Sequence, residues 1–320
     1  MPSPHLKQEP EGGERTMREQ TQIQKKKSLK KKLEPWSAYL WMAPTIILVL
    51  LFVMMPVVNT FTMAFSKVTK AGFLKGWNNF ENFTFVLEQE VFPRVMLNTI
   101  VWVIIIVSVC MVLSIALALI LNERFKGRKF VRTVLLLPWA TSQFIFACAW
   151  KYIFNYEFGN LNALLIQLGL IKENINWLGT ANSAFFCMVF VGFIVTIPFM
   201  TFTLLSGLTA ISNDYYEAAT IDGAGFWQKL FKITLPLVKP SLTVATVLNI
   251  IYVFNSFPIV WTITKGDPAN RTDTLVTYLY KLAFYNGKQG EAAAVSVIGF
   301  LILLICASVY MVSTLKKGDE

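Results

Sequence analysis

The sequence has few charged residues for its length. Only 15% of the 320 residues are charged and 55% are hydrophobic, whereas about a quarter of a typical soluble domain is charged. This composition excludes an ordinary soluble domain and predicts a membrane protein. Aromatic residues make up 14% of the chain, including 9 tryptophans, which suits belts of aromatic side chains at the two membrane surfaces.

Residues that commonly carry chemistry are also scarce. The 4 cysteines (Cys110, Cys148, Cys187 and Cys306) lie inside apolar runs without metal-ligand spacing, and the single histidine, His5, lies in a polar tail. No serine triad or His/Cys/carboxylate cluster stands out, and the phosphate-binding pattern G-x-x-x-x-G-K-[ST] is absent. The sequence therefore predicts no enzyme activity, no cofactor and no metal site in this chain.

Six apolar runs are long enough to span a bilayer, at about residues 38–65, 97–121, 131–154, 183–208, 241–263 and 292–314. We therefore expect an all-α polytopic membrane protein with six transmembrane helices. Pro44 and Pro56 should bend the first span, and Pro138 and Pro198 the third and fourth. No Asp or Glu lies inside a run, which argues against a proton-coupled carrier, because such carriers commonly need an intramembrane carboxylate.

The distribution of basic residues predicts the orientation. The net charge of +10 could suggest nucleic acid, but the lysines concentrate at residues 25–32, directly before the first apolar run, so we expect no nucleic-acid partner. The two tails and the loops at 122–132 and 209–240 hold 19 basic residues, and the opposite loops hold 10. By the positive-inside rule both termini are cytoplasmic, with residues 1–34 forming a basic tail rather than a signal peptide.

A polar stretch on the predicted cytoplasmic side, residues 209–240, indicates two short helices joined by a turn. Asp214 should cap the first helix, with Glu217 completing a capping box. Gly223 and Gly225 should stop that helix or let it turn sharply, and Pro236 and Pro240 should end the second. Two helices outside the bilayer suit the docking of a partner.

The same stretch resembles the cytoplasmic signature of permease subunits of binding-protein-dependent ABC importers. The pattern is EAA, three residues, G, nine residues and I-x-L-P, and the matching residues are Glu217, Ala218, Ala219, Gly223, Ile233, Leu235 and Pro236. In that family the loop is a coupling helix that sits in a cleft of the cytosolic ATPase. The resemblance implies coupling through Tyr216, Glu217, Ala218, Ala219, Asp222, Gly223 and Ala224, with Glu217 contacting ATPase backbone or basic groups.

Other segments resemble the maltose and glycerol-phosphate type of sugar permease. They are residues 77–99, RTVLLLPWA at 132–140, FGNLNALLIQLGL and INWLG, and the chain is similar to the first of the two paired permeases over about residues 36–315. The maltose permease has extra N-terminal spans and a large external insertion, so we expect the shorter six-span form of the type I ABC importer permease fold. The expected parts are a tail at 1–34, a first helix and external loop at 35–92, a core at 93–315 and a tail at 316–320.

Polar residues at helical spacing mark a candidate substrate pathway. One stripe comprises Asn249, Tyr252 and Ser256 with Asn255 alongside, and a second comprises Thr196, Phe199 and Thr203. Amides, hydroxyls and aromatic rings suit a neutral, hydroxyl-rich ligand, although hydrogen bonding between helices would use the same residues. Trp139, Thr141, Ser142 and Gln143 are further candidates. By the resemblance, Asn249, Val253 and Ser256 occupy sugar-contacting positions of the maltose permease, where Val253 is apolar and changes the contact set.

Together these features predict the permease subunit of an ATP-driven importer for a sugar or oligosaccharide. The resemblance implies a second homologous permease, two ATPase subunits that hold ATP and Mg²⁺, and an extracytoplasmic solute-binding protein, all at a bacterial cytoplasmic (inner) membrane. An ion-coupled secondary carrier, a non-transporting scaffold, and a permease for a sugar phosphate or another small polar solute are the alternatives. The sequence does not specify the sugar, and acidic residues offset the basic residues of the outer loops.

Overall fold

A computed structural model of the chain describes residues 39 and 41–316. The chain divides into two compact units, residues 1–59 and 60–320, which are described separately. The expected tails at 1–34 and 316–320 lie outside the described residues, apart from Lys316. The described part of the first unit is helical from Trp41 and contains the π-helical turn η1 (Leu50–Met54) and the beginning of α2 (Met55–Ala64).

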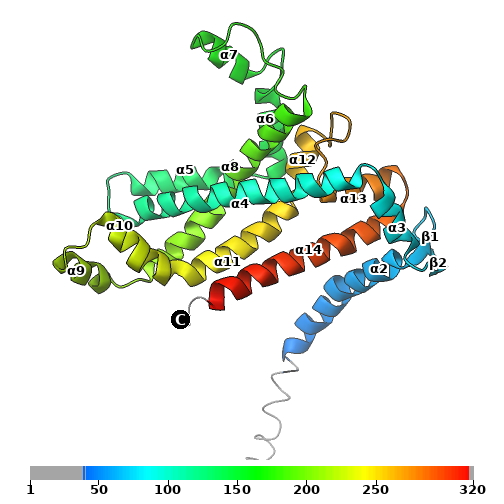
Figure 1. The fold of residues 1–320 in the computed structure, drawn as a ribbon, viewed down its shortest axis with the longest axis horizontal. Helices are drawn as coiled ribbons and strands as arrows, with labels where there is room; N and C mark the ends of the chain where they lie inside the picture. The colour runs from blue at the N-terminus through cyan, green and yellow to red at the C-terminus, as the bar shows by residue number, and fades with distance from the viewer. Residues whose placement is uncertain (1–38, 40, 317–320) are drawn as a thin grey trace, which may run out of the picture. The chain divides into compact units, whose positions relative to one another are not determined.

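The second unit is a helical bundle with one small β-ribbon (Figure 1). Its elements in order are β1 (Ser66–Val68), β2 (Leu74–Trp77), α3 (Glu81–Glu88), α4 (Phe92–Asn122), α5 (Arg128–Ala140), α6 (Gln143–Ile153), α7 (Asn160–Gln167), α8 (Ala181–Thr209), α9 (Asn213–Ile221), α10 (Phe226–Lys229), η2 (Leu230–Thr234), α11 (Leu235–Phe254), α12 (Phe257–Ile263), α13 (Leu275–Tyr280), η3 (Lys281–Tyr285) and α14 (Gln289–Lys316). The antiparallel β1–β2 pair is an addition to the expected all-α fold.

The expected spans correspond to long apolar helices. Five described helices could cross a membrane by length and composition, namely Trp41–Ala64, Phe92–Asn122, Ala181–Thr209, Phe226–Ile263 and Gln289–Thr314. The third expected span, 131–154, was wrong as a single helix, because α5 and α6 meet at 94°. Thr141, whose backbone is extended, and Ser142, at φ −55° and ψ 129°, lie at this bend, whereas Pro138 lies inside α5. Counted as one broken span, the pair completes the expected set of six.

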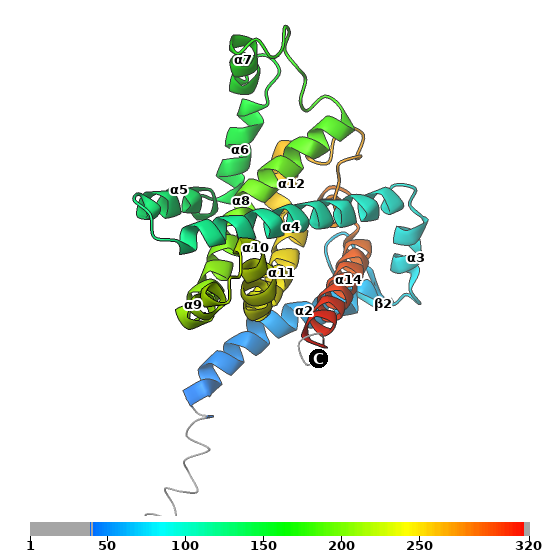
Figure 2. The same cartoon turned by 60° about the vertical axis from the view of Figure 1, so that its left-hand side comes forward.

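Three long helices build the centre of the second unit. α4 packs along α8, and α11 packs against both (Figure 2). Trp102 of α4 is 1% exposed and donates its indole N–H to the Val253 carbonyl of α11 at 2.9 Å. The mostly apolar interior of this helix triplet explains the uninterrupted hydrophobic runs of the sequence.

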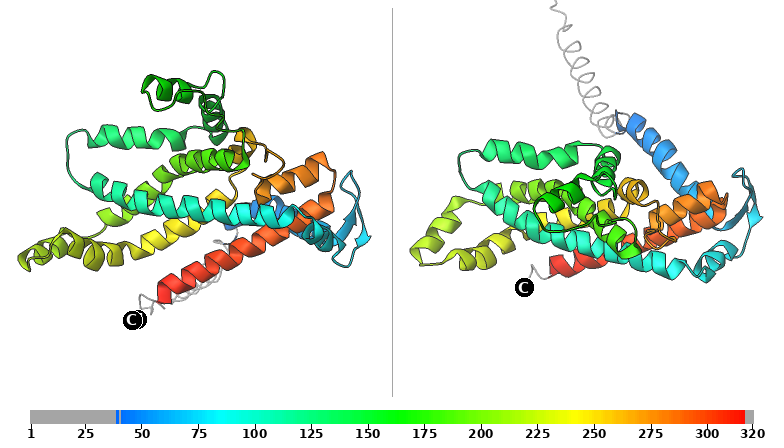
Figure 3. Two further views of the ribbon diagram at one scale, coloured as in Figure 1. Left: turned by 45° about the horizontal axis from the view of Figure 1, so that its top comes forward. Right: turned by 90° about the horizontal axis from the view of Figure 1, so that it is seen from above.

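The two ends of the second unit carry different elements. α9 and α10 lie at the end of the bundle where α4 finishes, and α3, β1, β2 and α13 lie at the opposite end (Figures 1 and 3). α6 turns away from α5 and carries α7 outward. This arrangement matches the expected order of loops, in which 209–240 and the loop near residue 80 lie on opposite sides.

The sequence predicted that the helix after Gly225 ends at its prolines, but the helix continues through them. α10, η2 and α11 follow one another without a break through Pro236 and Pro240, and the helix ends at Phe254. The π-helical turn η2 bonds the Leu235 N–H to the Leu230 carbonyl and places Pro236 in the first turn of α11, where a missing N–H is tolerated. The expected proline stop was therefore wrong, and a single helix runs from the polar stretch into the bundle.

A buried polar cluster, the Asp273 network, holds the loop between α12 and α13. The Asp273 carboxylate accepts hydrogen bonds from Lys281 Nζ at 2.7 Å and Thr277 Oγ1 at 2.9 Å, and its side chain is 1% exposed. Burial raises the pKa of the Asp273 carboxyl, and the Lys281 ammonium opposes that shift. The Asn98 amide of α4 donates to the Arg271 and Asp273 carbonyls. The Asn98 bonds fasten the loop to the first turns of α4.

Candidate functional site

The N-cap of α9 lies two residues before the predicted cap. Ser212 is the N-cap residue, and its hydroxyl accepts the Asp214 N–H at 3.3 Å. Asp214 lies in the first turn, where its charge suits the helix dipole. Glu217 is therefore too far along the helix to close a capping box, and that prediction was wrong. Both Ser212 and Asp214 are good caps by type, and only the backbone distinguishes them.

The end of α9 has the geometry predicted for a glycine stop. Gly223 has φ +76°, in the left-handed region. The Ala224 N–H bonds the Ala219 carbonyl at 2.8 Å, and the Gly223 N–H bonds the Thr220 carbonyl at 3.1 Å. This pair of bonds is the Schellman motif, which closes the last turn and reverses the chain.

Replacing Gly223 with valine should loosen the end of α9. A β-branched residue at positive φ costs about 1–3 kcal/mol, although a Cβ at this position would meet no atom within 4 Å. Amide hydrogen exchange at positions 223 and 224 should accelerate by roughly 5- to 150-fold. Gly225→Ala is the matched control, since Gly225 has φ −74° and equally free space, and equal exchange in both variants would contradict this prediction.

Two hydrogen bonds fasten α9 to the helix that follows. The Tyr216 hydroxyl lies 3.1 Å from Thr234 Oγ1 in η2. Lys229 Nζ donates to Thr220 Oγ1 at 2.7 Å. With the Schellman turn, these contacts join α9 to the start of the long helix, so a displacement of α9 will move that helix.

The outer face of α9 is exposed, and its Glu217 carboxylate has no ion-pair partner in the described part of the chain. Glu217, Ala218 and Asp222 are exposed, whereas Ala219 is 9% exposed and faces the turn. Glu217 forms no ion pair with any described residue. Ile221 is 87% exposed beside them. Small side chains, free carboxylates and an exposed apolar residue on one projecting helix form a surface suited to a protein partner.

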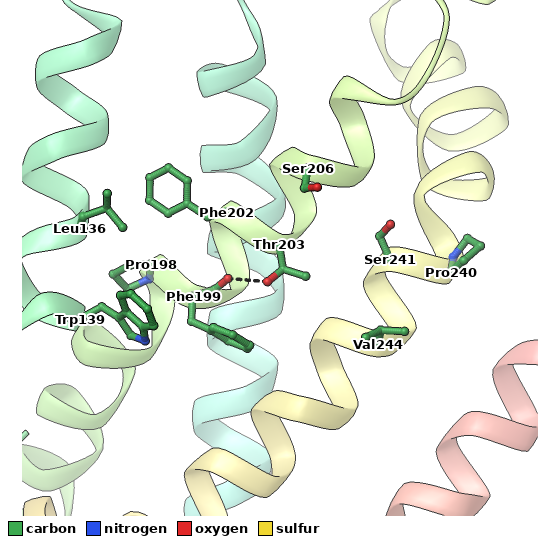
Figure 4. A pocket seen from close by; sticks show the side chains of 10 residues that line it. All are labelled: Leu136, Trp139, Pro198, Phe199, Phe202, Thr203, Ser206, Pro240, Ser241 and Val244. Carbon is green, nitrogen blue, oxygen red and sulfur yellow. Dashed lines mark hydrogen bonds between the residues drawn. The ribbon is translucent and has the colours of Figure 1, made fainter. Parts of the chain in front are cut away.

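A groove lies between α5, α8 and α11, and part of the candidate pathway lines it (Figure 4). We call it the pathway groove, with a volume of about 640 Å³. Its lining residues are Leu136, Trp139, Pro198, Phe199, Phe202, Thr203, Ser206, Pro240, Ser241 and Val244. Phe199 and Thr203 belong to the predicted α8 stripe, and the Thr203 hydroxyl donates to the Phe199 carbonyl at 2.8 Å.

An aromatic pair connects the groove to the predicted stripe of α11. The Tyr252 ring stacks on Phe199, with centroids 6.5 Å apart and ring planes 19° apart. Gln143, at the start of α6, donates its side-chain N–H to the Tyr252 hydroxyl. The structure thus brings together residues from α6, α8 and α11 that are far apart in the sequence.

The other predicted pathway residues lie deeper in the bundle. Asn249 and Val253 are 0% and 1% exposed, and the Asn249 amide donates to Met200 Sδ at 3.4 Å. Thr196 is 2% exposed and bonds the Gly192 carbonyl of its own helix. Asn249 Oδ1 has no hydrogen-bond partner among the described residues. In this conformation these side chains pack between helices rather than line the groove.

Asn255 and Ser256 mark the break between α11 and α12. The exposed Asn255 side chain donates to the Ile251 carbonyl at 2.8 Å. Ser256 is 6% exposed, and its hydroxyl has no partner among the described residues. The helical spacing that grouped both residues with Asn249 therefore extends past the actual end of α11.

Several groove residues did not stand out in the sequence. Ser206 continues the stripe of Phe199 and Thr203 by one turn, so extending that pattern would have found it. Ser241 and Val244 come from α11, and only the packing of α8 against α11 brings them to the groove. Trp139 lines the groove, whereas Thr141 and Ser142 form the bend between α5 and α6.

Comparisons with known proteins identify the fold and the family. Residues 110–315 match the family described as "Binding-protein-dependent transport system inner membrane component". The chain is 45% identical over 273 residues to a probable ABC transporter permease protein of Brucella suis, which covers 85% of this chain and 94% of the relative. It is 37% identical over 274 residues to the trehalose/maltose transport system permease protein of Thermococcus litoralis, covering 85% of this chain and 92% of the relative.

A solved structure has the same fold. It belongs to a bacterial ABC transporter involved in the import of the acidic polysaccharide alginate, with a TM-score of 0.79 and 25% sequence identity over 90% of this chain and 99% of that chain. The family match covers α9 and the groove residues of α8 and α11. This chain therefore belongs to the family of inner membrane components of binding-protein-dependent transport systems, the permease subunits of ABC importers.

Proposed function

We propose that this chain is the permease through which an ABC importer moves a sugar or oligosaccharide from an extracytoplasmic binding protein into the cytoplasm. It works with a second homologous permease and two ATPase subunits in the bacterial cytoplasmic membrane, with both termini and α9 on the cytoplasmic side. As a multi-pass permease subunit the chain is not an enzyme, since ATP is bound by the ATPase partners of this family. Family membership also decides against the ion-coupled carrier and the scaffold.

The stacked pair of Phe199 and Tyr252 beside the pathway groove is the observation that carries the sugar assignment. Aromatic faces stack on the C–H faces of sugar rings, and amides and hydroxyls bond sugar hydroxyls. Gln143 holds the Tyr252 hydroxyl and fixes the ring. The groove volume of about 640 Å³ falls within the roughly 300–1,000 Å³ of small-molecule sites.

The relatives point to the same class of substrate. The Thermococcus relative transports trehalose and maltose by its name, and the solved transporter imports alginate. Both substrates are saccharides, although one is neutral and the other acidic. These names support a carbohydrate as the substrate of this chain. Whether that carbohydrate is neutral or acidic has to be inferred from the residues of this chain.

The helix from Phe226 to Phe254 offers a route for coupling. It contains 29 residues and is about 43 Å long at 1.5 Å per residue. Its first turns are bonded to α9, and its last turn carries Tyr252. When ATP binding closes the ATPase subunits, movement of α9 shifts this helix as a rigid body and opens the groove outward, and hydrolysis resets it.

Tyr252 variants test the sugar assignment. Tyr252→Ala removes the ring that stacks on Phe199, whereas Tyr252→Phe keeps it. Because aromatic stacking contributes about 0.5–1.5 kcal/mol, the alanine variant should raise the KM for saccharide uptake by roughly 2- to 12-fold. The phenylalanine variant should change KM less, since only the hydroxyl bonded to Gln143 is lost.

The measurement uses the complete importer in proteoliposomes, with its binding protein and ATP. Radiolabelled maltotriose and an acidic trisaccharide serve as substrates, and ATPase subunits that co-purify with the tagged chain confirm assembly. Equal KM values for all three proteins would remove Tyr252 from the pathway. An assembled complex that moves peptides or amino acids but neither saccharide would overturn the proposed function.

A further inference from the structure

A second cavity lies between α6 and α12, away from the pathway groove. Its volume is about 410 Å³, again within the roughly 300–1,000 Å³ of small-molecule sites. α6 comes from the broken third span and α12 from the helix after the break at Asn255 and Ser256, and the two helices pack together. The cavity is lined by Phe144, Cys148, Lys151, Tyr152, Asn155, Trp261, Thr262 and Lys265.

Two lysines give the cavity a positive charge. Lys151 lies in the last turn of α6, and Lys265 follows α12. No acidic residue lines this cavity, and neither lysine forms an ion pair with a described residue. Lys151 Nζ donates one bond to the Thr262 carbonyl at 3.0 Å, which leaves two of its three N–H donors for a ligand. The site therefore favours an anionic group.

Asn155 offers a further polar group at the cavity, whereas the Thr262 hydroxyl does not. Thr262 is 8% exposed, and its Oγ1, which has no hydrogen-bond partner among the described residues, is closed to solvent and therefore to a ligand. Asn155 uses its side-chain oxygen to accept the Glu157 and Phe158 N–H groups, which leaves its own N–H donors to face a ligand.

Aromatic rings supply surface for a sugar ring. Tyr152 is 66% exposed at the edge of the cavity. Trp261 stacks on Phe257, with centroids 5.4 Å apart and planes 17° apart, and contacts the Tyr280 ring at 4.8 Å. Neighbouring rings thus hold the Trp261 indole in place, and a fixed aromatic face suits stacking on a pyranose ring.

We propose that this cavity is an outer subsite that receives a saccharide carrying a carboxylate, with the sugar ring on Trp261 and Tyr152 and the carboxylate between Lys151 and Lys265. The inference rests on the proposed function and its orientation, which places α6 and α12 on the extracytoplasmic half of the bundle. It narrows the substrate class from saccharides in general to acidic saccharides. The ligand would occupy this subsite before it enters the pathway groove.

A native thiol in the cavity provides a direct reading of occupancy. Cys148 is half-buried and lines the cavity, whereas Cys110 and Cys187 are buried. The assembled importer in nanodiscs is treated with N-ethylmaleimide in the presence of a linear trigalacturonate or of neutral maltotriose. Peptide mass spectrometry then measures the modification of Cys148 alone. Trigalacturonate should protect this thiol at concentrations roughly tenfold lower than maltotriose, because hydrogen bonds to charged groups are stronger than neutral ones.

Charge variants separate the subsite from other effects. Lys265→Gln and Lys151→Gln should each reduce the preference for trigalacturonate, and together they should abolish it. Lys172→Gln is the matched control, since Lys172 is an exposed lysine of the same predicted side that does not line the cavity. Lys265→Gln is the cleaner variant, because Lys151 also bonds α12 through the Thr262 carbonyl.

The outcomes separate this inference from the proposed function. Equal protection by both saccharides, no protection by trigalacturonate, or an unchanged preference in Lys265→Gln would overturn the acidic subsite. If the importer still transports maltotriose in that case, the proposed function stands and only the subsite fails. If the assembled importer moves peptides or amino acids but neither saccharide, the proposed function fails, while the thiol measurement still reports whether the cavity binds trigalacturonate.

Discussion

Replacing Glu217 with lysine should abolish substrate uptake while the chain still folds and inserts. Glu217 is exposed on α9 and forms no ion pair with a described residue of its own chain. Its replacement therefore removes nothing that holds α9 in place. We propose that its carboxylate contacts backbone or basic groups of the ATPase. A lysine at this position would place a positive charge beside hydrogen-bond donors and basic groups, which would repel it.

The expected loss is large, because a desolvated charge at an interface cannot return to water. Removing one partner of such a pair costs about 2–5 kcal/mol, or roughly 30-fold to several thousand-fold in Kd. Affinity purification through a tag on this chain should recover little ATPase with Glu217→Lys. Uptake in proteoliposomes should fall to background, and Glu217→Gln should give an intermediate result.

An exposed acid elsewhere at the same end of the bundle provides the control. Glu123 follows α4 and is also exposed. Glu123→Lys makes the same charge change outside α9, so uptake and ATPase recovery should stay near those of the unaltered chain. Uptake by Glu217→Lys within twofold of the unaltered chain would show that α9 does not couple through this carboxylate.

Local sequence signals placed the C-terminal end of α9 correctly, but they misassigned its N-cap and the end of the helix that follows it. Gly223 was predicted correctly because a helix end at positive φ depends on the residue itself. The cap was assigned to Asp214 instead of Ser212, since two good capping residues stand two positions apart. The prolines at 236 and 240 were expected to end a helix, but the helix continues because a π-helical turn upstream changes the hydrogen-bond register. No residue type in the sequence signals such a turn.

The pathway residues show a different limit. Helical spacing grouped Thr196, Phe199 and Thr203 on one stripe and Asn249, Tyr252 and Ser256 on another. Phe199 and Thr203 line the groove and Tyr252 stacks on Phe199, whereas Thr196 and Asn249 are buried between helices. Spacing does not reveal which stripe meets which helix. The Gln143–Tyr252 bond joins residues 109 positions apart, and it depends on the 94° bend between α5 and α6. The spans were therefore predictable, whereas the assembled groove required the tertiary structure.

The second large effect is expected at Gly266, where alanine should disrupt the Asp273 network. Gly266 has φ +86°, and a Cβ built there would overlap a carboxylate oxygen of Asp273 and approach Lys281 Nζ to 2.5 Å. The positive φ costs an alanine about 1–3 kcal/mol. Displacing the carboxylate also breaks a largely buried ion pair, whose two side chains are 1% and 21% exposed. Breaking a fully buried pair costs about 3–5 kcal/mol, so we expect a total loss of about 2–5 kcal/mol.

A thermal unfolding measurement on the purified complex checks this prediction. Since a loss of 1 kcal/mol lowers the Tm of a domain of this size by roughly 2–4 °C, Gly266→Ala should lower the Tm by roughly 5–15 °C. Gly287→Ala is the matched control, because Gly287 has φ +63° but its Cβ would make only ordinary contact with Lys70 at 3.5 Å. That variant carries the strain of positive φ without the clash. Equal Tm values for the two alanine variants would show that the Asp273 network contributes little, and the fastening of the outer loop to α4 would then depend on the Asn98 bonds and on the Thr99 hydroxyl that accepts the Leu275 N–H.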